Sequence, residues 1–207
     1  MHQGSSTPPL DEPRGLPVGR DDWETQYRTG RWKYLEGTRE LARYAVIAGY
    51  VAKHCSHPKL VDVGCGECVL WDFLGRAGVA HYTGIDLSSA ALERVKIPEE
   101  MRTLIAGDVE EDHFTNGQTF DAIVFNEVLY YPKFPMRVFE RYAEMLNPGG
   151  VMVVSMWHSP DPSSAHSQTV NKIWKAIDQG PWTGIDETAI TNIPTRRTWR
   201  IRVMSAS

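Results

Sequence analysis

A buried strand that ends in a glycine-rich turn is the feature that most restricts how this chain can fold. Residues 60–68 read LVDVGCGEC, an apolar run interrupted by one acidic residue and followed by Gly64 and Gly66. Glycine lets the backbone turn sharply and lets a ligand lie directly against the main chain. In doubly wound sheets, ligands bind beyond the carboxyl ends of the parallel strands, where such a turn lies. The segment therefore predicts an α/β fold with a ligand site above this turn.

Short apolar runs alternate with helical segments along most of the chain. The apolar runs predict strands at 59–63, 81–85, 103–106, 120–126 and 151–157. The segments between them predict helices at 69–76, 88–95 and 135–146, and apolar residues at helical spacing predict two more at 39–53 and 166–178. Nearly continuous apolar strands are typical of a parallel sheet that helices cover on both faces.

The C-terminal segment has a different pattern, which predicts a β-hairpin. Trp199, Ile201 and Val203 alternate with arginines, as expected for a half-exposed edge strand. A weaker strand at 188–193 and a turn at Pro194 would complete the hairpin. The arginines are interpreted as charges that protect the sheet edge from aggregation.

Composition limits the classes of protein to which the chain can belong. The net charge of -4 argues against a general nucleic-acid binder, which normally carries a basic surplus. Three cysteines are too few for a disulfide scaffold, so a reducing compartment is expected and the chain is predicted to be cytoplasmic. No apolar run approaches the roughly 18 residues of a membrane span, so no membrane association is expected.

The length of 207 residues fits one domain with a modest extension. Residues 1–20 hold four prolines and three glycines and are predicted to be a mobile tail. A single domain is expected over 21–207. It would consist of an aromatic and helical cap at 21–58, a ligand-binding core at 59–157, and a C-terminal helix with a hairpin at 158–207.

On the residues alone, the glycine turn could bind a nicotinamide dinucleotide, bind another ligand that contains a ribose, or bind no ligand. Asp86 lies twenty residues after Gly66, where a ribose hydroxyl pair would need an acceptor for two hydrogen bonds. A dinucleotide fingerprint requires a third glycine where this chain has Val69, so nicotinamide binding is disfavoured. A turn without a ligand would leave Asp62 and Asp86 unexplained. Cys65 and Cys68 form a C-x-x-C pair without a second pair, so no metal site is expected.

Five motifs in order indicate a family. They are Asp62-Val63-Gly64-Cys65-Gly66, Tyr82-Thr83-Gly84-Ile85-Asp86-Leu87-Ser88, Gly107-Asp108-Val109, Phe120-Asp121-Ala122-Ile123-Val124-Phe125-Asn126-Glu127-Val128-Leu129-Tyr130 and Leu146-Asn147-Pro148-Gly149-Gly150. Over about 59–157 the chain resembles class I S-adenosylmethionine-dependent methyltransferases of the small-molecule type. The resemblance implies a Rossmann-like, doubly wound, seven-stranded and mostly parallel sheet with an antiparallel last strand, in a three-layer αβα arrangement.

The resemblance also implies a cofactor site for S-adenosylmethionine. In it, Gly64, Cys65 and Gly66 would lie against the methionine and ribose, and Asp62 would receive the ligand's ammonium group. Asp86 would accept both ribose hydroxyls. The adenine would contact Leu87, Asp108 and Val109, and Asn126 would face the methionine. An isolated Asp108 would otherwise be interpreted as an Asx-type turn.

Methyl transfer from a sulfonium mainly requires alignment and exclusion of water, and a base is needed only if the acceptor is protonated. Candidates after the fourth and fifth strands are Glu127, Tyr130, Tyr131 and His158, of which Glu127, Tyr131 and His158 are taken as the catalytic candidates. The acceptor is expected to be a small molecule methylated on oxygen or nitrogen, and the chain to be a monomer or homodimer. The alternatives are a fold relative that binds the cofactor without methyl transfer, and, with less support, an NAD-dependent oxidoreductase.

Aromatic residues before the first strand predict a lid. Tyr27, Trp32 and Tyr34 are expected to contribute to the cofactor site, with Trp32 and Tyr34 lying over the pocket. Such rings exclude water and attract a sulfonium by cation–π interaction. They would otherwise only cover one end of the sheet. No separate substrate domain fits in the chain, so acceptor recognition would come from this segment and the loops after the fourth and fifth strands.

Overall fold

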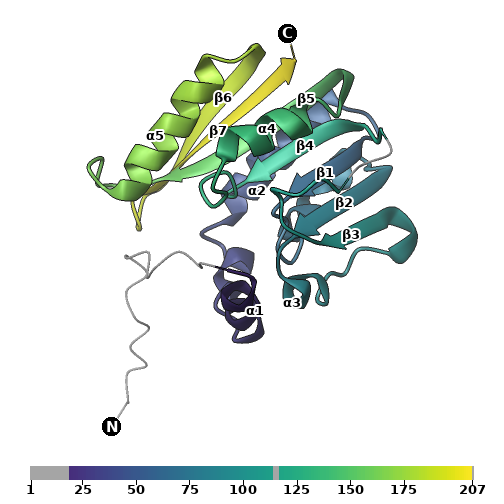
Figure 1. Ribbon diagram of the computed structural model, residues 1–207, viewed down its shortest axis with the longest axis horizontal. Helices are drawn as coiled ribbons and strands as arrows, with labels where there is room; N and C mark the ends of the chain where they lie inside the picture. Colours follow the sequence, from purple (N-terminus) through teal and green to yellow (C-terminus); the bar gives the residue numbers. More distant parts are fainter. Residues whose placement is uncertain (1–18, 114–116, 207) are drawn as a thin grey trace.

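A computed structural model describes residues 19–113 and 117–206 of the chain. The predicted mobile tail at 1–20 lies outside these residues except for its last two. None of the helices in the described ranges combines the length and apolar character that a membrane crossing requires. Figure 1 shows the helices arranged around one twisted sheet.

The sheet contains seven strands in the order β3-β2-β1-β4-β5-β7-β6. Their bounds are β1 Lys59–Val63, β2 His81–Asp86, β3 Arg102–Ala106, β4 Phe120–Asn126, β5 Leu146–His158, β6 Trp182–Asn192 and β7 Arg197–Ala206. The first five strands pair in parallel, and β7 pairs antiparallel with both β5 and β6. The predicted Rossmann-like sheet with an antiparallel last strand is confirmed.

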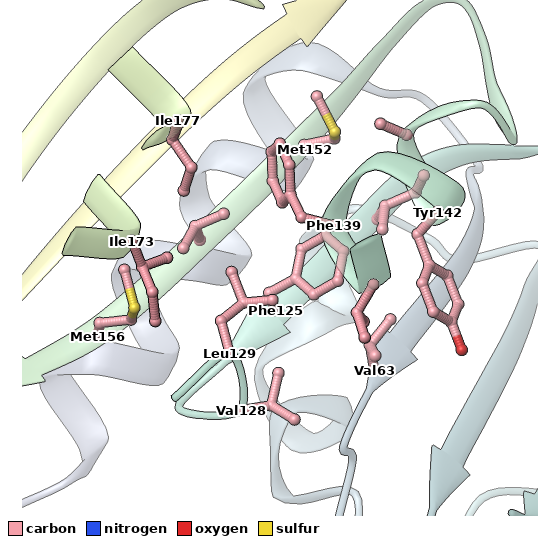
Figure 2. Close-up of a cluster of buried hydrophobic side chains, with 14 of the residues drawn as sticks. Val63, Phe125, Val128, Leu129, Phe139, Tyr142, Met152, Met156, Ile173 and Ile177 are labelled. Carbon is pink, nitrogen blue, oxygen red and sulfur yellow. The ribbon is translucent and has the colours of Figure 1, made fainter. Parts of the chain in front are cut away.

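Helices cover both faces of the sheet, because successive side chains of a strand point to opposite faces. The α-helices are α1 Arg20–Arg28, α2 Leu41–His54, α3 Ser89–Leu92, α4 Pro135–Ala143 and α5 Ala165–Asp178. Ile123 and Phe125 of β4 pack with α4 and α5, and Figure 2 shows Phe125 with Phe139 and Ile173 in this cluster. Ala122 and Val124 pack in the cluster that contains α2. The two clusters form the predicted three-layer core.

The predicted helix at 69–76 is present with these bounds as the 3-10 helix η2, Val69–Arg76. Two other predicted helices end earlier than expected. Helix α3 ends at Leu92, three residues before the predicted end at Val95. Helix α4 ends at Ala143, because Leu146 already pairs with Phe120 in the sheet. Strand β5 therefore begins at Leu146, five residues before the predicted start at 151.

The predicted position of the last strand in the sheet was also wrong. Strand β7 lies between β5 and β6, and β6 is the edge. Trp199 and Ile201 are buried on one face of β7. On its other face, Arg200 and Arg202 both form ion pairs with Glu187 of β6. An alternating pattern reports that one face is covered, which is equally true of an inner strand. These two arginines therefore join two strands and do not guard a free edge.

The N-terminal segment forms helix α1, which the sequence did not predict, followed by the 3-10 helix η1, Lys33–Glu36. A further 3-10 helix, η3, Glu99–Met101, precedes β3. Figure 1 shows α1 beside α3, at the end of the sheet where β1 and β2 terminate. Helix α1 therefore lies at the sheet edge where a ligand is expected.

Candidate active site

The glycine turn after β1 requires glycine at two positions. Gly64 has a φ of 71° and Gly66 a φ of 55°, a region that other residues rarely adopt. A Cβ on Gly64 would lie 2.4 Å from Cγ2 of Val128, and a Cβ on Gly66 would lie 2.6 Å from the phenol oxygen of Tyr27. The amides of Gly64 and Cys65 both donate to the carbonyl of Ile85, which fixes the turn against β2. The turn therefore lies beneath a side chain from α1.

Asp62 carries an unsatisfied acceptor at this edge. It is 2% exposed, and its Oδ2 accepts a hydrogen bond of 2.5 Å from the Tyr82 hydroxyl. No described residue donates to its buried Oδ1. Burial raises the pKa of Asp62 to about 7, although the bond from Tyr82 opposes this rise. A cationic ligand group at Oδ1 would satisfy this oxygen and favour the ionised carboxylate.

Asp86 at the end of β2 is held by the backbone. Its Oδ2 accepts from the Gly66 amide at 2.8 Å, and its Oδ1 accepts from the Ser88 amide at 2.9 Å. Burial raises its pKa to about 6, and these two hydrogen bonds limit the rise. Each carboxylate oxygen has more than one acceptor position, so hydrogen bonds from a ligand remain compatible with this arrangement.

The three predicted adenine contacts lie after β2 and β3. Oδ1 of Asp108 accepts from the Glu110 amide at 2.9 Å, which is the Asx-type turn that the sequence left as an alternative. The carbonyl of Val109 accepts from Arg141, and the carbonyl of Leu87 accepts from Arg20 at 2.6 Å. These backbone contacts fix the loop after β2 to α1 and the loop after β3 to α4.

Asn126 at the end of β4 belongs to a buried polar network that the sequence did not reveal. Arg43 of α2 is 1% exposed, and its Nη1 donates to Oδ1 of Asn126. Its Nη2 forms an ion pair of 3.0 Å with Glu40, which also pairs with Arg197 of β7 at 3.4 Å. Arg43 and Asn126 are 83 positions apart, and Arg43 sits within an ordinary amphipathic helical pattern, so no local signal marked it.

Glu127, a predicted catalytic candidate, is fixed in an unusual backbone conformation. Its φ is 61°, a region that costs a non-glycine residue of order 1 kcal/mol or more. Its carboxylate accepts three hydrogen bonds, from the Ser155 hydroxyl at 2.9 Å, the Tyr130 hydroxyl at 2.9 Å and the Trp157 amide at 3.0 Å. Burial raises its pKa, while the nearby Arg43 and the three hydrogen bonds oppose the rise. A strained residue held by several donors is typical of a functional position.

The other two catalytic candidates lie in different surroundings. Tyr131 packs edge-on against Trp23 of α1, with ring centres 5.0 Å apart, and burial raises its pKa, with Tyr34 and Glu127 adding to the rise. His158 ends β5, and burial lowers its pKa, with Arg200 and His166 lowering it further. Tyr131 therefore joins the aromatic cluster near Glu127, whereas His158 is influenced most by the C-terminal hairpin and α5.

The N-terminal aromatic residues form a continuous cluster. Trp23 stacks on Trp32 at 5.5 Å, and Tyr27 lies 6.2 Å from Trp32. Tyr34 continues the cluster at 5.9 Å from Trp32 and lies beside Arg197. Among the aromatic residues of the cap, Tyr27 is the one whose hydroxyl reaches Gly66 of the glycine turn. Trp32 and Tyr34 lie beside it, toward β7.

Helix α1 is attached to α3 by one carboxylate. Glu24 accepts from the amide and hydroxyl of Ser89, both at 2.7 Å, from the Ala90 amide at 3.0 Å and from the Ser88 hydroxyl at 3.2 Å. Burial alone would raise the pKa of Glu24, but these hydrogen bonds outweigh burial and lower it. This contact holds Trp23 and Tyr27 against the site.

The chain is similar to known proteins along most of its length. A family model described as a methyltransferase domain matches residues 31–201. The ubiquinone biosynthesis O-methyltransferase of Vibrio cholerae is 30% identical over 96 residues, which cover 44% of this chain and 39% of that protein. The chain thus spans less than half the length of this curated relative.

Solved structures with a similar fold cover more of the chain. The 1,6-didemethyltoxoflavin-N1-methyltransferase of Burkholderia thailandensis, with bound 1,6-didemethyltoxoflavin and S-adenosylhomocysteine, has a TM-score of 0.72 at 18% identity, over 96% of this chain and 94% of that chain. The [4+2]-cyclase SpnF has a TM-score of 0.64 at 13% identity, over 78% of this chain and 81% of that chain. At such identities the likeness establishes the fold alone.

Proposed function

Because this chain belongs to the methyltransferase domain family, we propose that it transfers the methyl group of S-adenosylmethionine to an oxygen or nitrogen of a small molecule. The observation that carries the proposal is the arrangement at the carboxyl edge of the sheet. There Asp62, Gly66 and Asp86 lie together, and Tyr27 covers the glycine turn. When bound, the cofactor supplies an electrophilic methyl group on a sulfonium.

The residues at this edge fit the chemistry of that cofactor. The orphaned Oδ1 of Asp62 suits the ammonium group of the methionine end. Asp86, which two backbone amides already orient, suits the ribose hydroxyls. Leu87, Asp108 and Val109 on the adjoining loops would contact the adenine. We further propose that the aromatic cluster excludes water from the reacting centre, since displacement at the methyl group mainly needs alignment in a dry site.

Glu127 is the residue best placed to receive a proton from the acceptor. Three donors hold its carboxylate, and burial raises its pKa above the ordinary value of a glutamate, the direction that strengthens a general base. Tyr131 packs between α1 and Tyr130 and would line the acceptor site. His158 would contribute less, since its electrostatic neighbours Arg200 and His166 belong to β7 and α5.

We infer that the acceptor is a small molecule. The net charge of -4 disfavours nucleic acid, and the Burkholderia structure contains bound 1,6-didemethyltoxoflavin, a small molecule. Acceptor recognition then falls to residues 21–58 and to the loops after β4 and β5. Both an O-methyltransferase and an N-methyltransferase occur among the similar proteins, so the acceptor atom is left as oxygen or nitrogen.

A second candidate is a chain that binds the cofactor and catalyses a different reaction. The specific observation in its favour is the similarity in fold to a [4+2]-cyclase. Methyl transfer separates the two candidates, because only a methyltransferase adds a methyl group to an acceptor.

Calorimetric titration of the purified chain with S-adenosylhomocysteine tests the cofactor assignment. We expect micromolar binding, and Asp86→Ala should weaken it by about tenfold or more, since one charge-assisted hydrogen bond contributes that much. Lack of binding at millimolar ligand contradicts the proposal. Incubation with methyl-labelled S-adenosylmethionine and a panel of small phenols, heteroaromatic amines and aliphatic amines then tests transfer. If the cofactor binds but no acceptor gains the label, the second candidate is favoured.

A further inference from the structure

We propose that Arg43 is a positioning residue that fixes the orientation of the Asn126 side-chain amide, so that its nitrogen faces the amino-acid end of the cofactor. This inference rests on the proposed function, because it concerns how the same site holds S-adenosylmethionine. Arg43 lies on α2 and is not part of the motifs that identify the family.

The chemistry of the guanidinium group determines which way the amide must face. Arginine carries N–H donors and no acceptor, so a group that contacts Arg43 must present an acceptor. Nη1 of Arg43 contacts Oδ1 of Asn126, and the opposite orientation would set N–H against N–H. The amide nitrogen, with two donors, therefore points away from Arg43.

The fold places this amide beside Asp62. Strands β1 and β4 are parallel neighbours in which Asp62 pairs with Val124, so Asn126 lies two positions beyond that level, beside Gly64. Leu60 of β1 and Val124 of β4 pack in the same core cluster. Since side chains alternate along a strand, Asp62 and Asn126 share that face.

Asp62 and Asn126 then offer complementary groups on neighbouring strands, about 5 Å apart across the sheet and offset by about 7 Å along the strands. The unpartnered Oδ1 of Asp62 accepts, and the oriented amide of Asn126 donates. An α-amino acid has an ammonium group and a carboxylate on one carbon, which match this pair. The methionine end of the cofactor fits it with the ammonium at Asp62 and the carboxylate at Asn126.

Two carboxylates of the protein, Glu40 and Glu127, attract the charge of Arg43. Glu40 pairs with Arg43 at 3.0 Å, and Arg197 pairs with Glu40 at 3.4 Å. Glu40 is 3% exposed, so this network is shielded from solvent. Glu40 and Arg43 are three positions apart on α2, so their ion pair is local to that helix, and the contact with Asn126 is the one through which Arg43 reaches β4. The same contact fixes which atom of the amide faces the guanidinium.

Two substitutions at position 43 separate orientation from packing. Lysine keeps only donors, so Arg43→Lys should preserve the amide orientation. Glutamine presents an acceptor as readily as a donor, so Arg43→Gln allows the amide to turn its oxygen toward the cofactor. Binding is measured with S-adenosylhomocysteine and with methylthioadenosine, which lacks the amino-acid group.

We expect Arg43→Gln to weaken the binding of S-adenosylhomocysteine by about tenfold or more, and Arg43→Lys to weaken it by no more than about threefold. Both should bind methylthioadenosine as the unaltered chain does. Unchanged binding of S-adenosylhomocysteine to Arg43→Gln overturns the inference. An equal loss of both ligands also overturns it, because that is the result of a general packing defect.

Asn126→Asp provides a second test that does not remove the buried arginine. Its carboxylate would pair with Arg43, so folding should be maintained, but the donors toward the ligand are lost. We expect it to weaken S-adenosylhomocysteine at least as much as Arg43→Gln and to spare methylthioadenosine. If Asn126→Asp retains its affinity for S-adenosylhomocysteine, the inference about Arg43 is overturned and the proposed function is not. Failure of the unaltered chain to bind S-adenosylhomocysteine removes the proposed function, and this inference with it.

Discussion

The phenol oxygen of Tyr27 lies 2.6 Å from the position that a Cβ on Gly66 would occupy. The next ring atom of Tyr27, Cζ, lies at 3.6 Å from that position, which is an ordinary van der Waals contact. The hydroxyl alone therefore conflicts with any side chain at position 66. Helix α1 packs on the glycine turn because Gly66 has no side chain and the Tyr27 hydroxyl occupies that space.

Gly66→Ala should destabilise the chain and weaken S-adenosylhomocysteine, and Tyr27→Phe should relieve part of both effects. The positive φ of Gly66 contributes about 1 kcal/mol of strain in either background. The remaining loss comes from the clash with the hydroxyl, which phenylalanine lacks. Thermal unfolding and ligand titration of both single variants and the double variant measure the coupling. Strictly additive effects would show that the two residues do not meet.

Glu24→Gln should loosen α1 with little effect on the rest of the fold. The carboxylate accepts four hydrogen bonds at α3, and the amide keeps only one acceptor atom. We expect a local loss of about 1 kcal/mol, seen as faster hydrogen exchange in residues 20–28. The lowered pKa of Glu24 means that this contribution is present above its ordinary value of 4.5 and is lost as pH falls through the lower folded value.

Thr25→Ala is a matched control in the same helix, since Thr25 is exposed. It should leave hydrogen exchange in α1 nearly unchanged. If Glu24→Gln and Thr25→Ala behave alike, Glu24 does not attach α1 to α3.

The strands and the glycine turn could be predicted because their signals are local. Residues 120–126 are apolar enough to be buried on both faces, and Gly64 and Gly66 mark the turn directly. Helix α1 was missed because it is mostly polar and is held by Glu24 and Tyr27, whose partners lie far along the chain. Arg43 was missed for the same reason. The spacing of apolar residues within one segment does not show which distant segment that segment contacts.

Glu127→Gln should lower the rate of methyl transfer and spare cofactor binding. A glutamine fills the same space but accepts no proton, and loss of a general base typically lowers the rate by about 100-fold or more. The rate is measured with the acceptor that the labelling panel identifies, over a range of pH.

Ser155→Ala removes one of the three donors to Glu127, so the carboxylate should become a stronger base. The acidic limb of its pH–rate profile should then move upward. An unchanged rate in Glu127→Gln would exclude Glu127 as the base.

Asp62→Asn should stabilise the ligand-free protein at alkaline pH and weaken the binding of the cofactor. The pKa of Asp62 is raised to about 7 from an ordinary 3.8, so the folded state holds a proton that the unfolded chain releases. Its contribution to stability is therefore greatest below 3.8, declines as pH rises and is lost above about 7. Asparagine carries no charge and avoids this loss.

The difference in unfolding free energy between Asp62→Asn and the unaltered chain should thus move by about 2 kcal/mol in favour of the variant from about pH 5 to about pH 8. Chemical denaturation at both values, without ligand, measures it. At the higher pH the variant should bind S-adenosylhomocysteine about tenfold or more weakly, because its amide cannot offset the ammonium charge. A difference that does not change with pH would mean that Asp62 titrates alike in the folded and unfolded states. Ionised Asp62 would then not destabilise the free folded chain, and the cofactor's ammonium group would have no such destabilisation to offset.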